Sequence, residues 1–216
     1  MPEGPEVFAL CLALNRLGLD AECYGKHLFH NRLDYSFGLN GRVHFDPDTQ
    51  TLSKVASGYI PGDCRPMASL QLIQLEHNKA PDWIEATRSE FEPLMRDLFR
   101  SRKTIASALL DQRSVAGIGV AWGSEILHAA GIDPGSRSKD IDPVRFMDAL
   151  IETRDRIREQ YSRFVDSLPE SELPRFVNEW FRNLYEIREM RVYKKGTLVV
   201  FSGRNWWIST DRMTLQ

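Results

Sequence analysis

The hydrophobic pattern changes character along this chain, and that change limits the folds open to it. Between residues 23 and 75 the apolar residues occur in short runs separated by Gly, Pro, Asn and Asp, at 27–29, 33–37, 42–45 and 69–75. From Glu90 onward they recur at helical spacing, which predicts helices over 90–101, 104–112, 119–130, 143–166 and 174–188. We therefore expect an α+β fold, with the strands preceding most of the helices.

Both ends of the chain add an element to this plan. Residues 3–17 are typical of an amphipathic helix, with Pro5 in its first turn and Gly18 after its end. Residues 197–209 carry β-branched and aromatic residues on both sides of 202–205, which predicts a β-hairpin with Arg204 at its tip. Three segments are expected: a β-rich domain with the first helix (1–88), a helical domain (89–190) and a terminal hairpin (191–216).

Bulk properties narrow the function classes. The 216 residues include three widely spaced cysteines and no apolar run long enough to span a bilayer, and the N-terminus lacks the cationic start of a signal peptide. These features favour a protein that is neither secreted nor membrane-bound, without disulfides or a cysteine metal site. The net charge of −2 argues weakly against a nucleic-acid partner, although bases cluster at 96–103 and 188–195.

The hexapeptide MPEGPE at the N-terminus carries groups that could take part in catalysis. Removal of Met1 would leave Pro2 with a terminal secondary amine, whose ordinary pKa of about 7.7–8.0 leaves part of it unprotonated at neutral pH. Such an amine can attack C1′ of a deoxyribose, and Glu3 or Glu6 could move the protons that this reaction requires. Chemistry alone favours a plainer interpretation, in which the two acids stabilise a helix N-terminus and Pro2 has no role.

Residues 104–134 carry the most specific motif. Their LLDQ, GIG and EIL pieces resemble the helix–two-turn–helix of the formamidopyrimidine-DNA glycosylase/endonuclease VIII family, in which Gly117 and Gly119 would bring the backbone close to a phosphate. MPEGPEV resembles the N-terminus of that family. The segments 24–29, 34–42 and 203–207 resemble its lysine strand, its void-filling turn and the end of its finger hairpin.

The resemblance implies a fold and a set of roles. The fold is a truncated β-sandwich with an N-terminal helix, then the helix–two-turn–helix domain and a zincless-finger hairpin. Pro2 would be the Schiff-base nucleophile, Glu3 the general acid/base, Lys26 a phosphate-binding catalytic lysine and Arg204 the hairpin arginine that grips the flanking phosphates. Glu6, Leu39, Gly117 and Gly119 would contact the substrate, with Leu39 filling the void left by a flipped nucleotide.

Four departures from the family pattern accompany the resemblance. The finger cysteines that bind zinc are missing, and Val120 replaces an asparagine that binds phosphate. The β region is short by roughly two or more strands, counted at the usual strand length. The net charge is mildly negative. These changes reduce the lesion-reading parts while Pro2, Glu3, Lys26 and Arg204 stay in place.

The implied activity is that of a bifunctional DNA glycosylase/AP lyase of base-excision repair. Such an enzyme excises oxidised or ring-opened bases and cleaves the strand by β,δ-elimination. The expected partner is damaged duplex DNA, bound inside the cell by a monomer that uses no metal or cofactor. Two alternatives stay open: an AP lyase that acts mainly on abasic or single-stranded DNA, and a non-catalytic nucleic-acid-binding protein that uses 104–134 as a phosphate clamp. A general interaction scaffold would leave MPEGPE and the arginine hairpin without a role.

Overall fold

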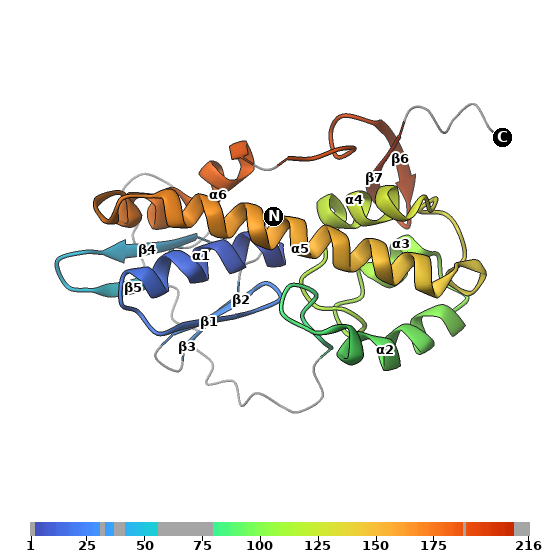
Figure 1. Cartoon of the computed structure of the whole chain (residues 1–216), viewed down its shortest axis with the longest axis horizontal. Helices are drawn as coiled ribbons and strands as arrows, with labels where there is room; N and C mark the ends of the chain where they lie inside the picture. The colour runs from blue at the N-terminus through green and yellow to red at the C-terminus, as the bar shows by residue number, and fades with distance from the viewer. Residues whose placement is uncertain (1–2, 31–32, 37–41, 56–79, 188, 210–216) are drawn as a thin grey trace. The chain divides into compact units, whose positions relative to one another are not determined.

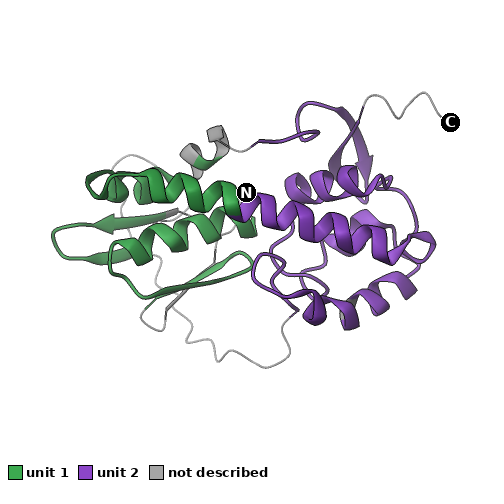
Figure 2. Cartoon of the chain, in the orientation of Figure 1, with its two compact units in different colours: residues 1–78, 159–188 green, residues 79–158, 189–216 purple. Residues whose placement is uncertain are grey.

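The computed structural model describes residues 3–30, 33–36, 42–55, 80–187 and 189–209 (Figure 1). These residues form helices and small antiparallel sheets, which confirms the α+β class. The chain forms two compact units, each built from two separate stretches (Figure 2). Unit 1 comprises 1–78 and 159–188, and unit 2 comprises 79–158 and 189–216. No helix among the described residues combines the length and the apolar character needed to cross a membrane.

Unit 1 begins with the helix α1 (Gly4–Arg16), close to the predicted 3–17. Pro5 lies in its first turn, and Gly18 follows its end with φ +81°, a left-handed conformation that suits glycine. Two antiparallel sheets follow. One pairs β1 (Ala21–Tyr24), β2 (His27–His30) and β3 (Leu33–Ser36) in that order, and the other pairs β4 (Arg42–Asp46) with β5 (Thr51–Val55).

The core of unit 1 joins the first and last parts of that unit. Helix α6 (Leu173–Ile187), preceded by the short 3-10 helix η2 (Glu170–Glu172), packs against α1 and β4. Val7, Leu10 and Leu14 of α1 are fully buried. Asn178 fixes α6 to β4, since the Phe45 N–H donates to its Oδ1 (2.7 Å) and its Nδ2 donates to the Phe45 carbonyl (3.1 Å). The side chain thus satisfies both backbone groups of Phe45, as a neighbouring strand would.

Unit 2 contains most of the predicted helical region. It consists of α2 (Arg88–Arg100), α3 (Ile105–Leu109), α4 (Val120–Ala130), the 3-10 helix η1 (Ser138–Asp140) and the part of α5 (Pro143–Ser167) that precedes residue 159. The hairpin of β6 (Thr197–Phe201) and β7 (Arg204–Ile208) completes it. Thr87 and Glu90 form a capping box at the start of α2, and Gly131 ends α4 in a left-handed conformation.

The structure departs from the sequence-based elements at four places. Strands β1 and β5 were not expected, because their residues 21–24 and 51–55 mix polar and apolar types without a clear period. Helix α3 ends at Leu109 instead of 112, because 110–113 form a turn. Helix α6, expected within a helical domain at 89–190, packs into unit 1. The predicted strand at 69–75 and the Asn40-Gly41 turn lie outside the described residues.

Candidate functional site

Two buried carboxylates stand at the start of unit 1. Glu3 is the N-cap of α1 and is 5% exposed, and Glu6 is 1% exposed. They form a reciprocal capping box, in which the Glu3 N–H donates to Glu6 Oε2 (2.9 Å) and the Glu3 side chain accepts from the backbone of Glu6. The hydroxyl of Tyr161 donates to Glu6 Oε1 at 3.5 Å. Glu6 therefore holds the backbone of Glu3, the residue that directly follows Pro2 in the chain.

Lys26 lies in the same unit, in the tight turn between β1 and β2. Tyr24 and His27 pair across this turn, so Gly25 and Lys26 are its two central residues. Gly25 has φ +56°, the left-handed conformation that two-residue hairpin turns require. The turn leaves Lys26 partly buried. The other two residues predicted for this region, Pro2 and Leu39, lie outside the described residues.

A glycine loop leads into α4 in unit 2, and the side chain of Gln112 holds it. Gln112 Oε1 accepts from the Gly117 N–H (2.9 Å), and its Nε2 donates to the Ile118 carbonyl (2.8 Å). Gly117 adopts φ +89°, and Gly119 is the N-cap of α4. A glycine N-cap brings no side chain to the first turn of α4, and a helix start of this kind suits a bound anion.

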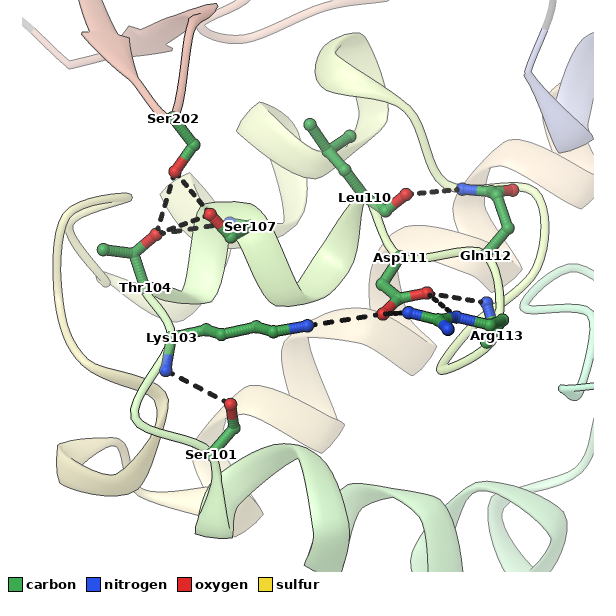
Figure 3. Close-up of polar contacts among 9 residues, drawn as sticks. All are labelled: Ser101, Lys103, Thr104, Ser107, Leu110, Asp111, Gln112, Arg113 and Ser202. Atoms are coloured by element: carbon green, nitrogen blue, oxygen red, sulfur yellow. Dashed lines mark hydrogen bonds and ion pairs between the residues drawn. The ribbon is translucent and has the colours of Figure 1, made fainter.

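The turn before this loop carries a fixed ion cluster (Figure 3). Arg113 binds both oxygens of Asp111, through Nε (2.9 Å) and Nη2 (3.0 Å), and Lys103 Nζ lies 3.5 Å from Oδ2. These cations, Arg113 first, lower the pKa of Asp111 to about 2. The Arg113 side chain remains 87% exposed. The two cations and one carboxylate therefore leave a net positive charge at the surface.

Glu125 of α4 anchors the segment that leads into the hairpin. It is 1% exposed, and its carboxylate accepts three backbone N–H bonds of 2.8 Å each, from Arg191, Val192 and Tyr193. A buried carboxylate is stable when donors satisfy its oxygens in this way. A segment that is distant in the sequence is thus held at a defined position against α4.

Packing against α4 holds the hairpin in place. Trp206 is fully buried against Gly123 of α4, and the Trp207 N–H donates to Ser124 Oγ (3.2 Å). At the turn, Ser202 Oγ bonds the hydroxyls of Thr104 and Ser107 at the start of α3 (Figure 3). Residues 197–208 contain neither Cys nor His, so they do not fit a zinc ion. The turn comprises Ser202 and Gly203, and Arg204 follows it as an exposed residue.

These elements border a cavity of about 440 Å³ that is open to solvent, within unit 2. Its lining brings together the first residue of α4, the anchored segment and the hairpin: Val120, Tyr193, Lys194, Gly203, Arg204, Asn205 and Trp207. Two cations, an amide and two aromatic rings thus surround the start of a helix whose N-cap is a glycine. The cavity has the charge and the donors to hold a phosphate.

Comparison with known proteins identifies the helical region. Residues 81–159 match the family described as the formamidopyrimidine-DNA glycosylase H2TH domain. The formamidopyrimidine-DNA glycosylase of Zymomonas mobilis is 32% identical over 129 residues, which cover 51% of this chain and 46% of that protein. Its counterpart from Synechocystis is 33% identical over 112 residues, covering 52% and 37%. This chain is thus similar to the formamidopyrimidine-DNA glycosylases over its helical region. The matched segments span less than half of each curated relative.

Solved structures show the same fold over more of the chain. The MutM (Fpg) protein of Thermus thermophilus aligns with a TM-score of 0.63 at 18% identity, covering 97% of this chain and 98% of that one. The Lactococcus lactis formamidopyrimidine-DNA glycosylase, solved non-covalently bound to DNA containing an AP site, aligns with a TM-score of 0.56 at 16% identity. That alignment covers 88% of this chain and 78% of the other. These two structures show the shared fold, and the matched H2TH domain together with the curated relatives bears out the predicted resemblance.

The predicted site residues divide between the two units. Gly119 and Arg204 belong to the structure around the cavity of unit 2, through the N-cap of α4 and the hairpin. Glu3, Glu6 and Lys26 belong to unit 1. Sequence reasoning did not assign roles to Gln112, Glu125, Tyr193 or Lys194. Lys194 lies in the basic run at 188–195, which was the available signal, whereas nothing in the sequence shows that Glu125 binds backbone donors.

Proposed function

We propose that this chain is a DNA glycosylase with AP lyase activity that acts in base-excision repair on oxidised or ring-opened bases. The observation that carries the proposal is the buried side chain of Glu3, which directly follows Pro2 and whose backbone N–H donates to Glu6, in a chain similar to these enzymes. The names of the relatives and of their H2TH domain support DNA as the substrate. The position of Glu3 directly after Pro2 supports a proton-transfer role, because a carboxyl beside the reacting amine can donate and accept the protons of ring opening and elimination.

The proposed reaction begins at the N-terminal amine of Pro2 after removal of Met1. The nitrogen lone pair attacks C1′, and the glycosidic bond breaks with its electron pair leaving on the base, which takes up a proton. Glu3 then donates a proton to the ring oxygen O4′, so the sugar opens and an iminium ion links Pro2 to C1′. Loss of the C2′ proton expels the 3′ phosphate, and the following elimination expels the 5′ phosphate. Water finally hydrolyses the iminium and releases the amine.

The cavity of unit 2 would hold the DNA backbone. Arg204 and Lys194 would contact phosphate as cations, and the backbone N–H groups at the start of α4 would donate to its oxygens. Val120 has no polar side chain, so these backbone groups replace the side-chain amide that the family pattern has there. Lys26 in its tight turn would contact a phosphate from unit 1, and duplex DNA bound by a monomer is the expected complex.

Trapping with borohydride tests the proposal. The full chain is incubated with duplex DNA containing an abasic site, and borohydride delivers hydride to the iminium carbon, which makes the adduct permanent. We expect a covalent adduct with the wild type and none with Pro2→Gly or with an N-terminally blocked chain. Glu3→Gln should lower the elimination rate by about 10²- to 10⁴-fold. Glu22→Gln, an exposed carboxylate on β1, is the matched control and should match the wild type.

Two outcomes would reject the proposal. The first is tight binding to abasic DNA without adduct or strand cleavage, which would instead indicate a non-catalytic DNA-binding protein. The second is a purified chain that keeps Met1 by mass spectrometry and still cleaves, since cleavage would then not use the Pro2 amine.

A further inference from the structure

The cavity between α4 and the hairpin has an aromatic wall that phosphate binding does not explain. Trp207 and Tyr193 meet edge to face, with ring centroids 6.0 Å apart at an interplanar angle of 70°. Both rings line the cavity together with Lys194, Arg204 and Asn205. A phosphate site needs cations and N–H donors, whereas aromatic rings beside cations are typical of sites that bind a nucleobase and its phosphate together.

The strand register shows why Trp207 is available. Successive residues of β7 point to opposite faces, so Trp206 turns into unit 2 and is fully buried, while Trp207 turns to the other face and is partly exposed. Leu198 pairs directly opposite Trp207 and is 46% exposed, so the apolar surface continues across the hairpin. Trp207 is therefore not required to fill the core.

Cations stand close to this aromatic pair. Lys194 Nζ lies 5.8 Å from the centroid of the Tyr193 ring, and Arg204 and Asn205 are exposed and line the same cavity. The Glu125 carboxylate accepts from the Tyr193 backbone N–H at 2.8 Å, so the backbone that carries this ring is fixed before any ligand arrives. The cavity volume of about 440 Å³ lies within the range of small-molecule sites, about 300–1,000 Å³.

We infer that this cavity binds one unpaired nucleotide of a DNA strand, with its base stacked on Trp207 beside Tyr193 and its phosphate on Lys194 and Arg204. The inference rests on the proposed function only in taking DNA as the ligand. An unpaired base is required because a paired base offers no free face to the ring. Stacking is indifferent to base identity, so the site would accept any base and would favour single-stranded over duplex regions.

Tryptophan fluorescence gives a direct test, because the chain has five tryptophans and the other four (Trp83, Trp122, Trp180 and Trp206) are at most 1% exposed. A thymidine 12-mer should quench the emission of Trp207, and the same strand annealed to its complement should quench it far less. Trp207→Phe should abolish the quenching and keep the affinity for the single strand. Trp207→Leu should weaken that affinity by about tenfold, the usual effect of losing one stacked base.

A backbone without bases separates stacking from phosphate binding. A 12-mer of tetrahydrofuran abasic units carries the same phosphates, and it should bind about tenfold more weakly and leave Trp207 unquenched. Equal binding of the two 12-mers, or equal affinity of Trp207→Leu and Trp207→Phe, would overturn the inference. Borohydride trapping of Trp207→Leu on duplex abasic DNA is read separately, so a failed stacking site and a failed lyase give different results.

Discussion

The indole of Trp206 lies so close to Gly123 that a Cβ placed on this glycine would stand 2.9 Å from Cζ3. Gly123 is inside α4, where alanine is ordinarily favoured over glycine by about 0.8–1 kcal/mol. The hairpin therefore depends on the absence of one methyl group, since a buried ring cannot move as the end of a flexible side chain can.

Gly123→Ala should lower the free energy of unfolding by about 1–3 kcal/mol, because overpacking at the ring outweighs the gain in helix propensity. Urea unfolding measures this change. In a Trp206→Leu background the same substitution should be neutral or stabilising, since the ring is gone. Equal effects of Gly123→Ala in the two backgrounds would show that Trp206 is not the cause.

Glu125→Ala should destabilise the packing of residues 191–193 against α4 more than any single substitution on the surface of unit 2. It leaves three backbone N–H groups without their charged acceptor, at a combined cost of about 3 kcal/mol or more. Hydrogen exchange at residues 191–193 should accelerate, as measured by mass spectrometry. Glu152→Gln, an exposed carboxylate on α5, is the control, and similar exchange in both variants would contradict the anchoring role.

The Asp111 cluster predicts an acid-dependent component of stability. The folded pKa of Asp111 is about 2, below its ordinary value of about 3.9. A carboxyl with a depressed folded pKa stabilises fully above the unfolded pKa, and this stabilisation is lost as the pH falls through about 2. The difference in unfolding free energy between the wild type and Asp111→Asn should thus be constant above pH of about 4 and shrink below it. A difference that is flat down to pH of about 2 would contradict the pairing.

Gln112→Ala should loosen the glycine loop at the start of α4. Loss of the bonds to Gly117 and Ile118 should reduce stability by about 0.5–1.5 kcal/mol and weaken DNA binding by a larger factor than the stability change alone explains. Gln112→Glu keeps the acceptor for Gly117 and loses the donor to Ile118, so its effect should be intermediate. Fluorescence anisotropy with labelled duplex DNA measures the affinity.

Arg204→Ala should weaken DNA binding and reduce the slope of log affinity against log salt by about 1, the effect of one lost phosphate contact. Arg204→Lys should restore the slope, because the charge remains, while recovering only part of the affinity. An unchanged slope in Arg204→Ala would place the arginine away from phosphate.

Local signals in the sequence predicted most of the elements of this fold. Turn residues and helical periodicity located α1, α2, α4, α5 and the β6–β7 hairpin within a few residues. These local signals could not show which residues contact one another across the fold. The backbone donors to Glu125 lie 66 to 68 positions away from it, and Asn178 binds a strand residue 133 positions away. Such pairs depend on tertiary packing, which no local pattern encodes.

The candidate site residues that lie in short sequence motifs could be predicted from the sequence. Glu3, Lys26 and Arg204 follow from the resemblance, and their roles remain predictions. The aromatic wall was harder to anticipate, because Trp206 and Trp207 are neighbours of one type in the sequence and only strand register assigns one to the core and the other to the cavity. That difference of one position separates a structural tryptophan from a candidate binding residue.

The division of both units into two stretches has a consequence for how this protein is made. Helix α1 leaves the ribosome well before its core partner α6, which begins at Leu173. At elongation rates of about 5–20 residues per second, the apolar face of α1 waits roughly 10–30 s for that partner. Val7, Leu10 and Leu14 must stay covered by something else during this interval, so the nascent chain should be a stronger chaperone client than a chain of similar length whose domains are contiguous.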